Sequence, residues 1–168
     1  ADAGASWLTS DLRLDTDPSG AADSCGARIC SDGQNVFVAW EDSRSGRTDV
    51  RFTRSTDGGA TWLTSDLRLD TDTVGASDSF GVRIACDGDS VCVAWSDWRN
   101  GAQPDIYLNR STDAGASWLS EDVRLDTDDA GTGYSADPRI ACAGARLYAV
   151  WYDVRDGAGD VRFSCNLP

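Results

Sequence analysis

The chain has 168 residues and a formal net charge of −13, with 28 acidic residues against 15 basic ones. Nucleic acids and anionic membranes bind to basic surfaces, so this charge argues against both as partners. The sequence has no run of 18 or more apolar residues, so no membrane insertion is expected. The sequence contains no histidine, which removes the most common general base and metal ligand.

A repeat of about 55 residues organises the chain. Trp7, Trp62 and Trp118 each end a copy of one short segment, and they lie 55 and 56 residues apart. The full copies read STDGGATW at 55–62 and STDAGASW at 111–118, and the shortened first copy reads DAGASW at 2–7. A fixed period of this length predicts a repeat architecture.

Four short strands are expected in each repeat. In the first complete copy they are 28–30, 36–40, 49–52 and 67–69, which are apolar or β-branched runs bounded by turn residues. A loop of the pattern D-x-R-x-G separates the second strand from the third. Equivalent strands are predicted at 12–14, 83–86, 91–95, 105–108, 123–125, 139–142, 147–151 and 160–163. No stretch has sustained helical periodicity, so the fold is expected to be all-β.

Four antiparallel strands per repeat are the anatomy of a β-propeller blade. STDGGATW and STDAGASW resemble the Asp-box, also called the bacterial neuraminidase repeat, of sialidases, sortilin-type receptors and secreted bacterial propellers. The resemblance implies a propeller of four-stranded antiparallel blades, three in this chain. In the box the Asp accepts bonds from turn amides, the Gly takes a left-handed conformation and the Trp fills space. We expect a structural role for Asp2, Gly4, Trp7, Asp57, Gly59, Trp62, Asp113, Gly115 and Trp118.

The order of strands along the chain predicts how the ring closes. Residues 27–69 and 82–125 each hold a whole blade, 138–164 hold three strands, and 1–14 hold a box and a fourth strand. The strand in 1–14 is therefore expected to complete the blade of 138–164. Propellers typically have four to eight blades, so we expect a homodimer that forms one six-bladed ring. The alternative is that the 168 residues are a piece of a larger propeller.

Two loops per repeat are expected on one face, and they bring together Asp, Arg, Ser and aromatic residues. Arg28, Arg83 and Arg139 are expected either to pair with Asp42, Asp97 and Asp153, which would lock neighbouring loops, or to contact a ligand. Candidate ligand-binding residues are Arg28, Asp42, Arg44, Arg83, Asp97, Trp98, Arg99, Tyr134, Arg139, Tyr152, Asp153 and Arg155.

Acidic pairs and cysteines give two further expectations. Asp-x-Asp pairs after each fourth strand offer the oxygen ligands that calcium prefers, although such pairs also cap turns: Asp15, Asp17, Asp70, Asp72, Asp126 and Asp128. No other cofactor is expected. Cys86 and Cys92 flank an Asp/Gly turn and are expected to form a disulfide; the alternative is buried thiols. Six cysteines favour an oxidising, extracellular location for a secreted protein.

Three functions compete. The first is a non-enzymatic, lectin-like propeller that binds a glycan or cell-surface ligand at several equivalent weak sites. The second is a structural or assembly module, with calcium as a stabiliser. The third is a sialidase-like hydrolase, for which the resemblance implies an arginine triad, a Tyr–Glu pair and an Arg-Ile-Pro motif. That motif is missing, and Glu41 and Glu121 are the only glutamates. The lectin-like function is therefore the expectation.

Overall fold

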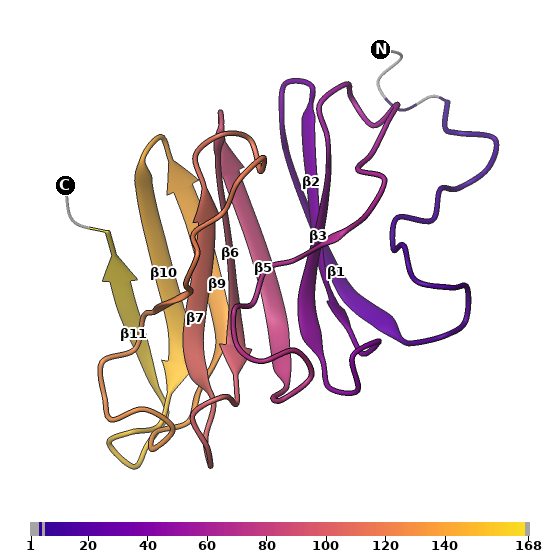
Figure 1. Cartoon of the computed structure of the whole chain (residues 1–168). Helices are drawn as coiled ribbons and strands as arrows, with labels where there is room; N and C mark the ends of the chain where they lie inside the picture. The colour runs from indigo at the N-terminus through magenta and orange to yellow at the C-terminus, as the bar shows by residue number, and fades with distance from the viewer. Residues whose placement is uncertain (1–3, 5, 167–168) are drawn as a thin grey trace.

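The computed structural model describes residues 4 and 6–166, and it is built from antiparallel sheets (Figure 1). The first sheet contains β1 (Ser24–Asp32), β2 (Asn35–Asp42), β3 (Asp49–Ser55) and β4 (Leu67–Arg68). The second contains β5 (Ser79–Asp87), β6 (Ser90–Asp97), β7 (Asp105–Ser111) and β8 (Val123–Arg124). The third contains β9 (Ser135–Ala143), β10 (Arg146–Asp153) and β11 (Asp160–Cys165), in the order β11-β10-β9. The all-β prediction is confirmed.

The three sheets stack face to face, and their first strands β1, β5 and β9 are neighbours along one edge of the stack. We call β1, β5 and β9 the inner strands. Residues 12–14, which were expected to form a strand, have no regular secondary structure and no ladder partner within the described part of the chain. Residues 4 and 6–166 contain no helix that is long and apolar enough to cross a membrane.

Large apolar side chains fill the space between the first and second sheets. Phe37 and Phe52 from the first sheet and Trp95 from the second are almost completely buried. Trp118, from the turn after β7, packs edge-on against Phe52 with ring centroids 4.8 Å apart. Each such side chain contributes roughly 1.5–3 kcal/mol through burial. The second and third sheets meet through two smaller clusters, one with Ala94 and Leu147 and the other with Ile106 and Trp151.

The STDGGATW segment folds into a turn that satisfies its own polar groups. Asp57 Oδ1 accepts hydrogen bonds from Ser55 Oγ (2.7 Å) and Thr61 N (2.8 Å), and Oδ2 accepts one from Thr61 Oγ1 (2.6 Å). The bonds from Thr61 and Ser55 lower the pKa of Asp57 to about 2. Gly59 has φ +90°, a conformation that glycine adopts without strain. The same bonds recur around Asp113, whereas Asp2 lies outside the described residues.

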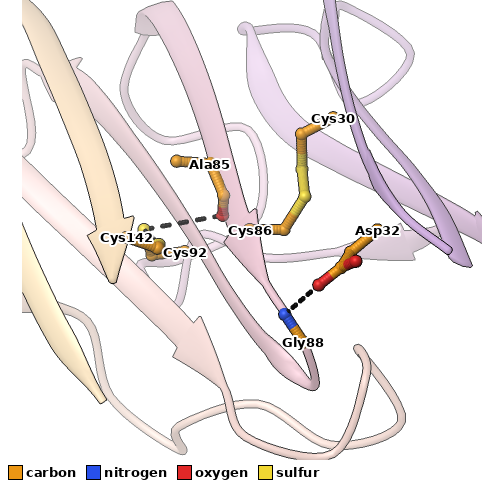
Figure 2. Close-up of a disulfide and its surroundings, with 7 residues drawn as sticks. All are labelled: Cys30, Asp32, Ala85, Cys86, Gly88, Cys92 and Cys142. Carbon is orange, nitrogen blue, oxygen red and sulfur yellow. Dashed lines mark hydrogen bonds between the residues drawn. A yellow bond between two sulfur atoms is a disulfide. The ribbon is translucent and has the colours of Figure 1, made fainter. Parts of the chain in front are cut away.

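A disulfide joins the first two sheets (Figure 2). It connects Cys30 of β1 to Cys86 of β5, with the Cα atoms 6.1 Å apart. The expected Cys86–Cys92 bond is therefore wrong. In the β5–β6 ladder Cys86 lies opposite Val91 and Cys92 opposite Ala85, so these neighbouring pairs point to opposite faces of the sheet. Cys92 Sγ instead lies 2.7 Å from Cys142 Sγ of β9.

Candidate functional site

Each D-x-R-x-G loop holds a buried aspartate in a fixed set of hydrogen bonds. Asp42 accepts from Ser24 Oγ (2.8 Å), Trp40 Nε1 (3.2 Å), Arg44 N (3.0 Å) and Arg44 Nη2 (2.7 Å). Burial by itself would raise the pKa of Asp42, but the bonds from Arg44, Ser24 and Trp40 outweigh it and hold the pKa below its usual value. The same set surrounds the other two loops through Ser79, Trp95, Asp97 and Arg99, and through Ser135, Trp151, Asp153 and Arg155.

The arginine that pairs with each of these aspartates is not the expected one. We expected Arg28, Arg83 and Arg139 as partners, and this is wrong. The arginine two positions after each aspartate, in the same loop, donates hydrogen bonds to both carboxylate oxygens, as Arg44 does to Asp42. Asp42, Asp97 and Asp153 are fully buried, so a ligand would reach them only if this network opened. The side chains of Arg44, Arg99 and Arg155 belong to the same network and are only partly exposed, at 18%, 14% and 16%.

The pairing leaves three arginines together on the inner strands. Arg28 on β1, Arg83 on β5 and Arg139 on β9 make no ion pair within the described part of the chain, and each donates only to backbone carbonyls next to it. Burial lowers the pKa of Arg83, and the charges of Arg139 and Arg28 lower it further. Arg28 and Arg139, on the two strands that flank β5, are therefore close enough to Arg83 for their charges to act on it. We call these three residues the arginine cluster.

Two carboxylates, those of Glu41 and Asp137, lie near the arginine cluster, and their negative charges raise the pKa of Arg83 in opposition to the burial and the two arginines. Glu41 Oε1 accepts hydrogen bonds from the backbone N–H groups of Gly81 (2.8 Å) and Val82 (3.2 Å). Gly26 lies opposite it with φ +64°, a conformation that favours glycine, and a Cβ atom there would lie 2.7 Å from Glu41 Oε1. Asp137 is exposed and has φ +55°, an uncommon conformation for a residue other than glycine.

Aromatic pairs stand beside the same strands. Trp98 lies 6.4 Å from Phe80, and Tyr134 lies 6.4 Å from Tyr152, between ring centroids. Tyr152 is 45% exposed. Sequence reasoning named Trp98, Tyr134 and Tyr152 but did not assign Phe80, Glu41 or Asp137 to the site. Asp137 occupies the repeat position of Gly26 and Gly81, which also have positive φ, so the repeat itself marks this position. The bonds of Glu41 reach the neighbouring sheet, and no local sequence signal could have revealed them.

The Asp-x-Asp pairs form a different kind of site. Asp49, Asp70 and Asp72 bring carboxylate oxygens within 4.8 Å of one another, as do Asp105, Asp126 and Asp128, and such groups could hold a metal ion. In each group an arginine already touches the three carboxylates. Arg68 lies 3.2 Å from Asp49 and 2.9 Å from Asp70, and it also pairs with Asp72. Arg124 does the same at 3.0, 3.0 and 3.1 Å. A metal ion would have to displace this guanidinium.

The crowding of carboxylates predicts a pH-dependent stability. Burial, followed by the charge of Asp49, raises the pKa of Asp70 to about 7 despite Arg68. The folded chain therefore binds more protons than the unfolded chain between pH 4 and 7, and its stability falls as the pH rises through this window. Asp70→Asn should raise the free energy of unfolding by about 1–2 kcal/mol at pH 8 and leave it unchanged near pH 4.5.

Urea denaturation at the two pH values measures this difference. Asp89→Asn, in the exposed β5–β6 turn, is the matched control and should have no effect at either pH. An Asp70→Asn effect that is the same at pH 4.5 and pH 8 would show that the carboxyl does not titrate in this window.

No protein-family model matches the sequence, and no curated protein sequence matches it. Solved structures do match. They include an α-L-arabinanase of Penicillium chrysogenum, complexed with arabinobiose, at 13% identity and a TM-score of 0.53. They also include a family 117 glycoside hydrolase of the marine bacterium Zobellia galactanivorans, at 9% identity and a TM-score of 0.56. A sialidase of Trypanosoma rangeli matches at 13% identity and a TM-score of 0.50. The matches cover 80%, 92% and 88% of this chain, and 41%, 56% and 31% of those chains.

These matches correct one expectation. The three structures are glycoside hydrolases, and this finding overturns the expected non-enzymatic, lectin-like function. At 9–13% identity the likeness itself shows the fold alone, and the chain spans about half or less of those proteins. The stacked antiparallel sheets of this chain have a β-propeller fold.

Proposed function

We propose that this chain is part of a propeller glycoside hydrolase that acts on sugars carrying an anionic group. The arginine cluster carries the proposal. Nine of the fifteen arginines form ion pairs. Six form none within the described part of the chain, and three of these, Arg28, Arg83 and Arg139, lie on the adjacent inner strands. A carboxylate or sulfate placed between these guanidinium groups would accept paired hydrogen bonds and relieve their mutual repulsion.

The surroundings of the arginine cluster suit a sugar ring and its hydrolysis. Glycoside hydrolysis uses two carboxyl groups that flank the bond to be broken. We assign proton transfer to the exposed Asp137, and stabilisation of the positive charge on the sugar to Glu41, which two backbone amides hold in place. The Tyr134–Tyr152 and Phe80–Trp98 pairs offer flat apolar faces on which a sugar ring can pack. The propeller fold shared with glycoside hydrolases supports this reaction class.

The proposal includes no metal, because the guanidinium groups of Arg13, Arg68 and Arg124 already pair with the carboxylates where calcium was expected. It includes membership in the Asp-box propellers, which the self-contained turns at Asp57 and Asp113 support. It also includes secretion into an oxidising compartment, which the Cys30–Cys86 disulfide supports.

Fluorogenic glycosides that do or do not carry a carboxylate test the function. The protein should hydrolyse a carboxylated substrate, such as a sialoside or a glucuronide, faster than a neutral arabinofuranoside. Arg83→Ala should lower kcat/KM for the carboxylated substrate by about 10- to 100-fold, since it removes one charged hydrogen-bonding partner of the anion.

Arg146→Ala is the matched control, because Arg146 is exposed on β10 and lies outside the arginine cluster. It should leave kcat/KM unchanged. The melting temperature in the presence of glucuronate gives a second readout, which should rise for the wild type and for Arg146→Ala but not for Arg83→Ala. Equal losses in the two variants, or no turnover of any glycoside together with no shift by glucuronate, would contradict the proposal.

A further inference from the structure

The outer edge of β11 has no strand beside it within the described part of the chain, although the equivalent strands β3 and β7 are paired with β4 and β8. The difference in burial is large. Val161 of β11 is 81% exposed, whereas Val50 and Ile106, at the same ladder position in the other sheets, are 0% exposed. Phe163 is 62% exposed, whereas its equivalent Phe52 is fully buried. The edge of β11 therefore has the residues of a covered strand without a cover.

A groove lies between the second and third sheets, close to this edge. Its walls include Leu108, Arg110, Leu119, Val123, Tyr148 and Cys165. Between the first and second sheets the equivalent place is filled: Trp118 packs on Phe52, and Arg54 Nη1 donates to Ala114 O at 2.5 Å. Leu108 and Arg110 occupy the ladder positions of Phe52 and Arg54. The groove therefore has the shape and polarity to receive a Trp-containing turn like that at 111–118.

An ion cluster is also incomplete at the same edge. Asp49 and Asp105 begin β3 and β7, and each pairs with an arginine of the adjoining fourth strand while its side chain is at most 1% exposed. Asp160 begins β11 in the same way, but its side chain is 50% exposed. At the other end of the chain, Arg13 pairs with Asp15 and Asp17, both at 2.5 Å, as Arg68 does with Asp70 and Asp72. Arg13 pairs with no third carboxylate among the described residues, and its side chain is 43% exposed.

The segment around Arg13 is already positioned for such a contact. Thr16 N and Oγ1 donate to Asp66 Oδ2, both at 2.8 Å, and Thr71 N donates to Asp122 Oδ2 at the same distance in the next repeat. Thr16 thus sits against the first sheet as Thr71 sits against the second. Trp7 and Leu12, which precede it, are 87% and 54% exposed. Figure 1 places this segment and β11 at opposite ends of the stack, so one molecule cannot join them.

We propose that residues 7–17 of a second copy of this chain cover the edge of β11. Leu12 to Leu14 form the missing fourth strand, Arg13 pairs with Asp160, and Trp7 enters the groove beside Leu108. The two copies exchange these segments reciprocally, so that six blades close into one ring. The surface is independent of the proposed hydrolysis, because it is defined by the exposed edge and not by the arginine cluster.

Light scattering of the purified protein tests the assembly. The wild type should have twice the mass of one chain. Arg13→Asp and Asp160→Arg should each give the mass of one chain at micromolar concentration, which corresponds to a rise of about 100-fold in the dissociation constant. The double variant Arg13→Asp/Asp160→Arg restores opposite charges and should recover the dimer.

Arg47→Asp is the control, because it reverses another exposed arginine, in the β2–β3 loop, and should remain dimeric. Circular dichroism checks that every variant is folded. A single-chain mass for the wild type would overturn the proposal. So would a dimer that survives both single charge reversals, or a mass other than two chains. The mass is read without substrate, so this result and the failure of hydrolysis are distinguishable.

Discussion

Replacing both Cys30 and Cys86 by serine is expected to lower the free energy of unfolding by about 4 kcal/mol. The disulfide closes a loop of 56 residues, and a cross-link of this span removes much of the conformational entropy of the unfolded chain. It also ties the inner strand of the first sheet to that of the second. For a chain of this size the melting temperature should fall by about 10 °C.

Differential scanning calorimetry without reductant measures this change. Cys25→Ser is the matched control, because Cys25 is exposed and makes no disulfide, and it should leave the melting temperature unchanged. Adding a reductant to the wild type should reproduce the loss seen in the double serine variant. A double variant as stable as the wild type would mean that the sheets hold together through packing alone.

The longer strands could be predicted from the sequence because the signals that define each of them lie within its own residues and the turns beside it. The runs 36–40, 91–95 and 147–151 lie within β2, β6 and β10, and their alternation and bounding turns need no partner to be recognised. The fourth strands are different. β4 and β8 have only two residues each, and residues 12–14 form no strand without a neighbouring edge. A short strand is defined by the ladder that it joins, so its formation cannot be predicted from its own residues.

The disulfide could not be predicted, because it depends on which face of the sheet each side chain occupies. Cys86 and Cys92 are close in sequence and lie across a tight turn, but their neighbouring ladder positions face opposite sheets. A shift of one residue in register reverses the face of every side chain. Cys30 and Cys86 are 56 residues apart, close to the repeat length, yet their ladder positions differ: Cys30 lies opposite Phe37 and Cys86 opposite Val91, which is equivalent to Val36. This offset is what turns the two thiols towards each other.

The candidate site was half predictable for a related reason. The arginines and aspartates were recognised, but their pairing depends on distances that the sequence does not contain. In the β1–β2 ladder Ser24 lies opposite Asp42, whereas Arg28 lies opposite Ala39. Arg44 can reach Asp42 through the turn of its own loop, so it pairs first. The arginine cluster is the consequence: it appears only when the loop arginines have taken the buried carboxylates.

Asp97→Ala is expected to lower the free energy of unfolding by about 3–5 kcal/mol, because it leaves several buried groups without a partner. Asp97 is fully buried and accepts hydrogen bonds from Ser79 Oγ, Trp95 Nε1 and Arg99. In the variant Arg99 still pairs with Asp122, which lies 2.8 Å from its Nη1 atom. It loses its partner at Nη2, which is the carboxylate of Asp97.

Urea denaturation at pH 7 measures this loss, and Asp97→Asn and Asp89→Ala are the comparisons. The asparagine keeps the shape and part of the bonding of Asp97, so it should lose less than alanine. Asp89→Ala, in an exposed turn, should lose nothing.

Burial alone would raise the pKa of Asp97, but Arg99 and Trp95 lower it below its usual value. Asp97 therefore stabilises the fold above about pH 4, and its contribution should disappear as the pH falls further, whereas Asp70 acts in the opposite direction between pH 4 and 7. A loss on Asp97→Ala no larger than that of Asp89→Ala would show that the buried network does not hold the blade.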